Sequence, residues 1–576
     1  MENTEVKKSK DSAFSKTLNK YFHHLDRGSH LRSEVLCGII IFLVSICLLF
    51  VNMQLCGKYI LGDLTLSSSP ADQTSIDAAK TYVSIYQGSL LVSFISALLI
   101  GLIARLPLVQ VSFMGLSSCF IGFVTGNSGL TYYNLIFISF ISSIIYAIIA
   151  GVPFIKNKII KALPKVVLHA LPLVSGLFLI YIGVTLSGFV TTSSLTTGNL
   201  ATNGISSSVF GLAKLSGVTL YAFIAVIFGF VVYMFLRATK AKHPISFSFL
   251  CTIGLFLLIS IFGLLKNNFS TTLEDSYMNF GRIWLIAGSQ ANPNTPFADS
   301  SLTYCLSGIG EIFSNFGNVF TKGCDFTSYE GSPALLVIST ILSTVLFQFV
   351  DPFVVIEASK DDLNEGSSEV IDLENDNQKL YWINAGMNVV APFFGSGAVT
   401  ISKTSLIATK DKAKSGIVPL VAAIGYLISM FAFAFPALLA TNNYTVGSMN
   451  EFNYFAYGNG GLVYLIQGAS FGIADAVVVI IGLLMIEKSV VLLKDDEIKY
   501  LPVIVGLIAG LLINSLSLGI LISMAYILVV DLFEPLEENK DKNFFVSLFL
   551  SCKSNYKKVN FYYLGLFVYS LLAVCL

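Results

Sequence analysis

The stretch ALLVISTILSTVLFQFVDPFVVIEASKDD, from Ala334 to Asp362, joins a membrane-length apolar run to one carboxylate and one proline. Asp351 would cost roughly 3 kcal/mol at the centre of a spanning helix, so a residue of this kind normally faces a cavity or a partner. Pro352 removes one backbone donor, and we expect it to break the helix and to free the carbonyls around Phe347 and Gln348. Broken helices of this kind line transporter binding sites. The alternative is a simple kink near the headgroups.

Composition places the chain in the membrane. Of its 576 residues, 54% are hydrophobic and only 12% are charged, which is typical of polytopic membrane proteins. The net charge of zero and the absence of basic runs interleaved with aromatic residues argue against nucleic-acid binding. The cysteines form no CxxC pair and the histidines show no HExxH spacing, so we expect no metal and no cofactor. The polar N-terminal segment predicts no cleaved signal peptide.

Apolar segments of about spanning length fall into two groups of seven. The first group, within 35–265, comprises 35–55, 85–105, 108–126, 132–154, 166–189, 215–237 and 244–265. The second group, within 333–534, comprises 333–357, 380–395, 396–408, 416–440, 466–487, 500–515 and 517–534. Because seven is odd, the second group begins on the opposite side of the membrane. We therefore expect an all-α polytopic membrane protein with 14 transmembrane segments in a 7+7 inverted repeat.

Charge predicts the orientation of this fold. Most of the 35 Lys and Arg residues fall on one side of the expected membrane, and the positive-inside rule makes that side cytoplasmic. The N-terminal tail, 1–34, and the C-terminal tail, 535–576, are then both cytoplasmic, and the loop 266–332 is extracellular. The C-terminal tail contains a further hydrophobic segment that could span the membrane, re-enter it or lie at its surface. We expect the plasma membrane as the location.

The third segment of each group is short and interrupted by small residues. The first contains MGLSSCFIGF, from Met114 to Phe123, and the second contains FFGSGAVTISK, from Phe393 to Lys403. Interruptions at corresponding positions of two halves point to a binding site between the repeats. Glycine and serine also permit close helix packing, which is the structural alternative for either stretch.

Five stretches, taken together and in order, resemble the adenine/guanine/hypoxanthine (AzgA-like) branch of the xanthine/uracil permease superfamily. The first is similar to the branch's G-x-x-x-R-T-E-x-x-A-G motif, the second to its M-G-L-N-A stretch, and the fourth to F-x-D-T-x-G-T-L. The stretches are HLDRGSHLRSEVLCGIIIFLVSICLLFVNMQLCG (His24–Gly57), GLIARLPLVQVSFMGLSSCF (Gly101–Phe120), Pro164 with GLFLIYIG (Gly176–Gly183), FQFVDPFVVIEASKDD (Phe347–Asp362) and FFGSGAVT (Phe393–Thr400).

The resemblance implies a core domain and a gate domain, a homodimer in the lipid bilayer, and elevator-like transport of a purine nucleobase with protons and without a cofactor. It places the substrate against Asp351 and between the two broken segments. Asp351 would also take up the coupled proton, with Glu357 as a second acidic group nearby. A purine offers N–H donors to a carboxylate, acceptors to backbone N–H groups at helix ends, and ring faces to aromatic side chains. The substrate-binding residues implied in this way are Asp351, Ser117, Ser118, Gly397, Ala398, Thr404, Phe349 and Phe113.

The chain also departs from the branch in four places. Ser117 stands where the branch has Asn, Thr404 where it has a glutamate, and Ala385 where it has an aspartate. The small residues that follow the aspartate of the eighth helix in the branch are replaced by Pro352, Phe353 and Val354. Lys403 is either a cytoplasmic residue of the positive-inside kind or a sign of an anionic substrate. Two alternatives therefore stand beside purine transport: a transporter of the same fold for xanthine, uracil or an anion, and a membrane receptor that does not transport. An enzyme is not expected, because the sequence offers no set of nucleophile, base and oxyanion donors.

Overall fold

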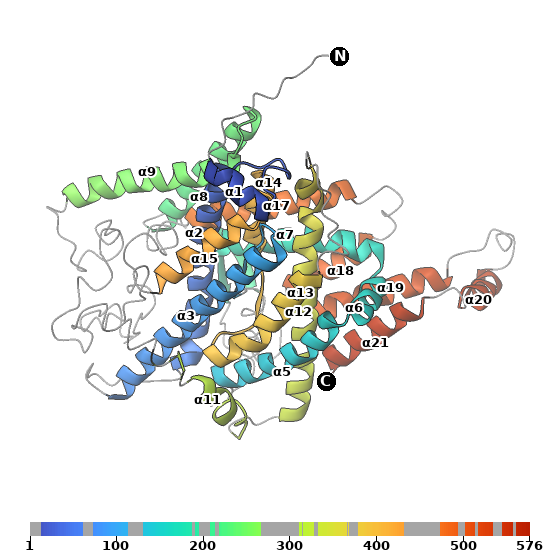
Figure 1. Ribbon diagram of the computed structural model, residues 1–576. Helices are drawn as coiled ribbons and strands as arrows, with labels where there is room; N and C mark the ends of the chain where they lie inside the picture. The colour runs from blue at the N-terminus through green and yellow to red at the C-terminus, as the bar shows by residue number, and fades with distance from the viewer. Residues whose placement is uncertain are drawn as a thin grey trace, which may run out of the picture.

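A computed structural model of the chain shows a mostly helical protein (Figure 1). The structure describes residues 13–61, 73–112, 131–186, 190–194, 208–212, 218–266, 310, 312–313, 315–327, 332–365, 367, 378–430, 473–492, 501–512, 516–533, 544–556 and 560–575.

The N-terminal half is made of long helices. They are α1 (Ala13–Phe22), α2 (Leu31–Leu61), α3 (Gln73–Leu99) with the π-helical turn η1 (Ile100–Ala104), α5 (Tyr132–Gly151), α6 (Pro153–Ala162), α7 (Lys165–Leu186), α8 (Val218–Ala238) and α9 (Pro244–Lys266).

The C-terminal half contains long helices and several short helical turns. They are α11 (Asn315–Thr321), α12 (Pro333–Asn364), α13 (Gln378–Val390), η4 (Ala391–Phe394), η5 (Lys403–Ser405), α14 (Leu406–Lys410), α15 (Ile417–Ser429), α17 (Ile473–Leu492), α18 (Leu501–Leu512), α19 (Leu516–Phe533), α20 (Phe544–Asn555) and α21 (Phe561–Cys575).

Local sequence explains where several of these helices begin. Thr131 and Asn134 form a capping box at the start of α5, in which each side chain bonds the other residue's backbone N–H. Pro153 and Pro333 occupy the first turns of α6 and α12, where a missing N–H costs nothing because that group has no partner within the helix.

Four described helical segments are long and apolar enough to cross a membrane. They are Ser84–Ala104, Tyr132–Gly151, Ala334–Asn364 and Leu516–Phe533, and the pair α6 and α7, bent by 87°, adds a fifth when taken as one broken span. Six further apolar helices of 10–17 residues, such as Ile417–Ser429, are shorter than a full span. With the composition of the chain, these segments make it an integral membrane protein. The count of fourteen spans stays a prediction, since several expected spans include residues outside the described part.

Two pairs of short antiparallel strands depart from the expected all-α fold. Strand β1 (Gln110–Ser112) pairs with β4 (Val399–Ile401), in the register Gln110↔Ile401, Val111↔Thr400 and Ser112↔Val399. Strand β2 (Val190–Ser194) pairs with β3 (Ser208–Leu212) within the expected loop after α7. Non-helical backbone at membrane depth needs hydrogen-bond partners from the protein. The strands β1 and β4, one from each interrupted segment, supply such partners to each other.

The expected helix break at Pro352 is wrong. Helix α12 runs without interruption from Pro333 to Asn364, with Pro352 inside it. A single proline removes one backbone hydrogen bond, whereas ending the helix there would expose several unpaired backbone groups in apolar surroundings. Neighbouring polar groups can meet the need of the freed carbonyl, which is why prolines are tolerated in membrane helices.

Helix packing links the two halves in reciprocal pairs. Helix α2 packs on α15, and α12 packs on α5; α3 packs on α15, and α13 on α5; α8 packs on α17, and α18 on α7. If the segments are numbered within each half, every contact in this series has a counterpart with the halves exchanged. Helices α7 and α17, like strands β1 and β4, hold the same position in each half and contact each other directly.

The contact between α7 and α17 is a crossing of two glycines. A Cβ atom added to Gly176 would lie 2.5 Å from the carbonyl oxygen of Gly482, and one added to Gly482 would lie 2.5 Å from the carbonyl oxygen of Gly176. Close approach of this kind is how membrane helices pack with small residues at their interface.

The C-terminal hydrophobic segment forms α21 and packs on α19 and α12. The Tyr569 hydroxyl of α21 donates a hydrogen bond of 2.6 Å to the carbonyl oxygen of Leu342 in α12. This part of the expected tail therefore belongs to the helical body of the protein.

Candidate functional site

A buried ion pair joins α12 to the segment after β4. The Asp351 Oδ1 atom lies 3.4 Å from the Lys403 Nζ atom, and the two side chains are 5% and 6% exposed. Lys403 is therefore not the cytoplasmic surface residue that the positive-inside rule suggested. Asp351 faces the protein interior, as its apolar context predicted.

The second oxygen of the Asp351 carboxylate, Oδ2, takes no part in this ion pair. Among the described residues, the buried Oδ2 atom has no hydrogen-bond partner. Buried acceptors are usually satisfied, since leaving one unpaired costs about 1–3 kcal/mol and more for a charged group. The Oδ2 atom is thus a place where a bound donor would be favourable.

The sequence after β4 holds Lys403 in position through a local capping turn. Ser402 accepts a hydrogen bond from the Thr404 backbone N–H, so the helical turn η5 begins at Lys403. The Thr404 hydroxyl lies 2.7 Å from the Ser402 hydroxyl and 3.0 Å from that of Ser45 on α2. Lys403 is thereby fixed between α12 and α2.

A network of buried amides surrounds the strand pair, with Asn388 of α13 at its centre. The Asn388 Oδ1 atom accepts from the backbone N–H of Val399 in β4 at 3.0 Å and from Gln348 Nε2 of α12 at 3.2 Å. Gln348 also donates to the Ser143 hydroxyl of α5 at 3.0 Å. Because Gln348 lies one turn before Asp351, the network fixes the face of α12 that carries the ion pair.

The network continues to β1 through Asn384. Gln110 Nε2 donates to Asn384 Oδ1 at 2.8 Å, and Asn384 Nδ2 donates to the Tyr146 hydroxyl of α5 at 2.6 Å. Asn388 Nδ2 in turn donates to the Asn384 backbone carbonyl at 2.8 Å. All three amide residues are fully buried. Helices α5 and α13 thus hold both strands through side chains rather than through apolar packing alone.

Substitution of Asn388 by leucine tests this network. We expect a loss of about 1–3 kcal/mol in the free energy of unfolding, because the Val399 N–H and the Gln348 amide lose their partner. The midpoint of thermal unfolding in detergent measures it. Asn318→Leu is the matched control, since the Asn318 side chain, only partly buried, donates a long 3.4 Å bond to the Tyr133 hydroxyl. Equal shifts for both variants would contradict a special role of the network.

Some of the predicted site residues lie close to the ion pair of Asp351 and Lys403, and others do not. Thr404 lies next to Lys403 and is 2% exposed. Phe349 is buried and stacks on Tyr381 of α13, with ring centroids 6.4 Å apart. Glu357 is six residues beyond Asp351 on α12, which puts it about 120° away around the helix. Phe113, Ser117 and Ser118 lie outside the described residues.

The family resemblance puts the backbone of Gly397 and Ala398 at a half-helix terminus, but no helix begins at these residues. These two residues lead into β4, and the helical turn begins only at Lys403. An added Cβ atom at Gly397 would meet no atom within 4 Å among the described residues. The interruption of the segment was predicted correctly, but the helical turn that follows it begins at Lys403 and not at Gly397.

Sequence reasoning missed Gln110, Asn384 and Asn388. Each is an uncharged amide in an apolar run of spanning length, and the same energetic argument that singled out Asp351 applies to them in weaker form. The spacing of Asn384 and Asn388 by one helical turn was the available signal, because it puts both amides on one face of α13.

Comparison with known proteins gives the following. No family model and no curated protein matches the sequence. Among solved structures, the transmembrane domain of a cyanobacterium bicarbonate transporter BicA is similar, with 13% sequence identity, a TM-score of 0.38, and coverage of 86% of this chain and 96% of that one. SLC26A9 is similar with 11% identity and a TM-score of 0.35, covering 88% of this chain and 66% of that one.

Proposed function

We propose that the protein is a secondary active transporter whose substrate binds beside Asp351, and that the substrate is a purine nucleobase such as hypoxanthine, adenine or guanine. One observation carries the proposal. A buried carboxylate in a spanning helix keeps one oxygen without a partner among the described residues, next to a strand pair formed by the two interrupted segments. A solute with N–H donors fits that oxygen.

The reciprocal packing of the two halves supports a 7+7 inverted repeat with core and gate domains. Under this division α2, α3, α5, α12, α13, α15 and both interrupted segments form the core, and α7, α8, α9, α17, α18 and α19 form the gate. The self-paired contacts, β1 with β4 and α7 with α17, would then lie on the axis that relates the repeats. An elevator-like motion would carry the core, with its ion pair, past the gate.

The ion pair supplies a chemical route to proton coupling. Asp351 accepts an N–H of the base through Oδ2 while Lys403 balances its charge through Oδ1. Protonation of Asp351 would weaken its attraction to Lys403 and would let the carboxyl group accept an N–H of the base through one oxygen and donate its own O–H to a ring nitrogen, so the proton and the base could bind together at one carboxylate. Glu357, on another face of α12, is a second candidate proton acceptor. A homodimer in the plasma membrane with cytoplasmic termini completes the proposal.

A small anion is the second candidate substrate, favoured by the buried ammonium of Lys403. A buried lysine at the start of a helical turn is a common anion-binding arrangement. Asp351 competes for that ammonium, so an anion would have to displace the carboxylate or bind with a proton. The two candidates differ in which of the paired residues contacts the substrate.

Uptake of labelled hypoxanthine in cells without their own base transporters tests the proposal. We expect saturable uptake that unlabelled bases compete for and inorganic anions do not, and at least a tenfold loss in Asp351→Asn at equal membrane abundance. Asp362→Asn is the control on the same helix, because Asp362 pairs with Lys410 at 3.2 Å rather than with the site. Competition by anions alone supports the second candidate, and full uptake by Asp351→Asn contradicts the role of Asp351.

A further inference from the structure

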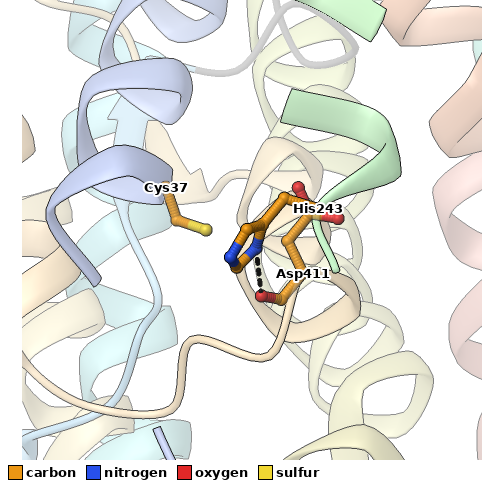
Figure 2. A group of neighbouring side chains, drawn as sticks. All are labelled: Cys37, His243 and Asp411. Atoms are coloured by element: carbon orange, nitrogen blue, oxygen red, sulfur yellow. Dashed lines mark hydrogen bonds between the residues drawn. The ribbon is translucent and has the colours of Figure 1, made fainter. Parts of the chain in front are cut away.

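Three side chains from distant parts of the sequence meet where α2, α9 and the turn after α14 come together. The ligand-type atoms of Cys37, His243 and Asp411 all lie within 4.8 Å of one another (Figure 2). Cys37 is on α2 and fully buried, His243 is half-buried immediately before α9, and Asp411 is the fully buried residue that follows α14. The cluster lies outside the substrate site proposed above.

A hydrogen bond determines which nitrogen of the His243 imidazole carries the proton. The His243 Nδ1 atom lies 2.9 Å from the backbone carbonyl oxygen of Asp411. Because a carbonyl oxygen can only accept, Nδ1 carries the proton, and Nε2 is left with a free lone pair. Histidines that bind metals commonly donate their other ring N–H to a carbonyl in this way. Burial also lowers the pKa of His243, which keeps the ring neutral.

The Asp411 carboxylate has one oxygen engaged and one open. Its Oδ2 atom accepts from the Ser246 backbone N–H at 3.0 Å and from the Ser246 hydroxyl. The Oδ1 atom is buried and has no hydrogen-bond partner among the described residues. A bound metal ion would give this open carboxylate oxygen a partner.

We propose that Cys37, His243 and Asp411 bind a zinc ion, with a water molecule as the fourth ligand. One thiolate, one imidazole and one carboxylate suit Zn²⁺, whereas Ca²⁺ and Mg²⁺ prefer oxygen ligands alone. Ligand atoms at about 2.0–2.3 Å from a tetrahedral zinc lie roughly 3.3–3.7 Å apart. Side-chain rotations that move the ligand atoms by about 1 Å would therefore bring them to the distances that a zinc ion needs.

The position of the site gives the ion a regulatory consequence that rests on the proposed function. Under the proposed division, Cys37 and Asp411 belong to the core and His243 to the gate. A bound ion would link the two domains at one end of the protein. It would thus stabilise one conformation and slow transport.

Zinc binding to the purified full-length chain in detergent tests the site without any substrate. Calorimetric titration with Zn²⁺ should give one ion per chain, and Cys37→Ser and His243→Gln should each weaken the affinity at least roughly tenfold. Cys251→Ser is the matched control, because Cys251 is exposed on α9. Cd²⁺ should give a cadmium–thiolate absorption band in wild type and in Cys251→Ser that Cys37→Ser abolishes.

The outcomes separate the metal site from its effect. Absence of stoichiometric binding, or equal zinc affinity in wild type and both site variants, overturns the site. If Cys37→Ser does not fold, the zinc affinity of His243→Gln alone tests the metal site. In uptake assays, Zn²⁺ should slow wild-type transport, reversibly on chelation, and leave His243→Gln unaffected. Binding without any effect on a measured uptake overturns the regulatory link and leaves the metal site established.

Discussion

Replacing Lys403 with methionine should lower the free energy of unfolding by about 3–5 kcal/mol, because it leaves the Asp351 carboxylate buried without its partner. Asp351→Asn should cost a similar amount, since it strands the buried ammonium of Lys403. The two side chains are 5% and 6% exposed and 3.4 Å apart, so solvent cannot replace the missing charge. Thermal unfolding in detergent, followed by size-exclusion chromatography of the surviving protein, measures both losses.

The double variant Asp351→Asn with Lys403→Met measures the energetic coupling between the two residues. A neutral replacement of a buried ion pair is often no less stable than the pair itself, so the double variant should regain most of the lost stability. It should not regain hypoxanthine uptake, because the carboxylate that accepts the substrate N–H is gone. Losses that simply add in the double variant would show that the two residues are not energetically coupled.

An exposed ion pair provides the control for this cycle. Arg237 on α8 and Glu487 on α17 lie 2.6 Å apart, but their side chains are 48% and 50% exposed. The coupling between exposed charges is usually between 0 and about 1 kcal/mol. The cycle Arg237→Met with Glu487→Gln should therefore show a coupling several-fold smaller than that of Asp351 and Lys403.

The burial of Asp351 could be predicted because the argument is local. An acidic side chain within an apolar run has few acceptable environments, and the protein interior is one of them. The partner of Asp351 could not be found in this way. Lys403 is 52 residues further along the chain, and only the strand pairing that returns the chain beside α12 brings it there. A count of charges on each side of the membrane assigned it to a loop instead.

The interrupted segments show the same limit. Glycines and serines in Phe393–Lys403 correctly predicted a break in the helix. They did not predict a strand, because the strand exists only through its pairing with Gln110–Ser112, which lies before the small residues of the other segment. The cluster of Cys37, His243 and Asp411 likewise has no sequence signature, since its three residues come from separate segments of the chain.

Gly176→Leu should destabilise the protein by at least about 3 kcal/mol, because α7 and α17 could no longer reach their present separation. The obstacle to a side chain at Gly176 is the Gly482 carbonyl oxygen, 2.5 Å from the added Cβ. Backbone atoms of a helix cannot rotate away as a flexible side chain can, so the two helices would have to move apart. Thermal unfolding in detergent measures the loss.

Gly254→Leu is the matched control. Gly254 lies in the apolar helix α9, and an added Cβ there meets no atom within 4 Å among the described residues. Because leucine has a better helix propensity than glycine, this variant should be neutral or more stable by up to about 1 kcal/mol.

The size of the new side chain decides whether the backbone contact is the cause. An alanine at Gly176 already places its Cβ within 2.5 Å of the Gly482 carbonyl oxygen. Most of the loss should therefore appear in Gly176→Ala, with a smaller further loss in leucine. Gly482→Ala should behave in the same way, because the crossing is reciprocal. A neutral alanine followed by a large loss for leucine would mean that side-chain volume, and not the approach of the two backbones, limits this interface.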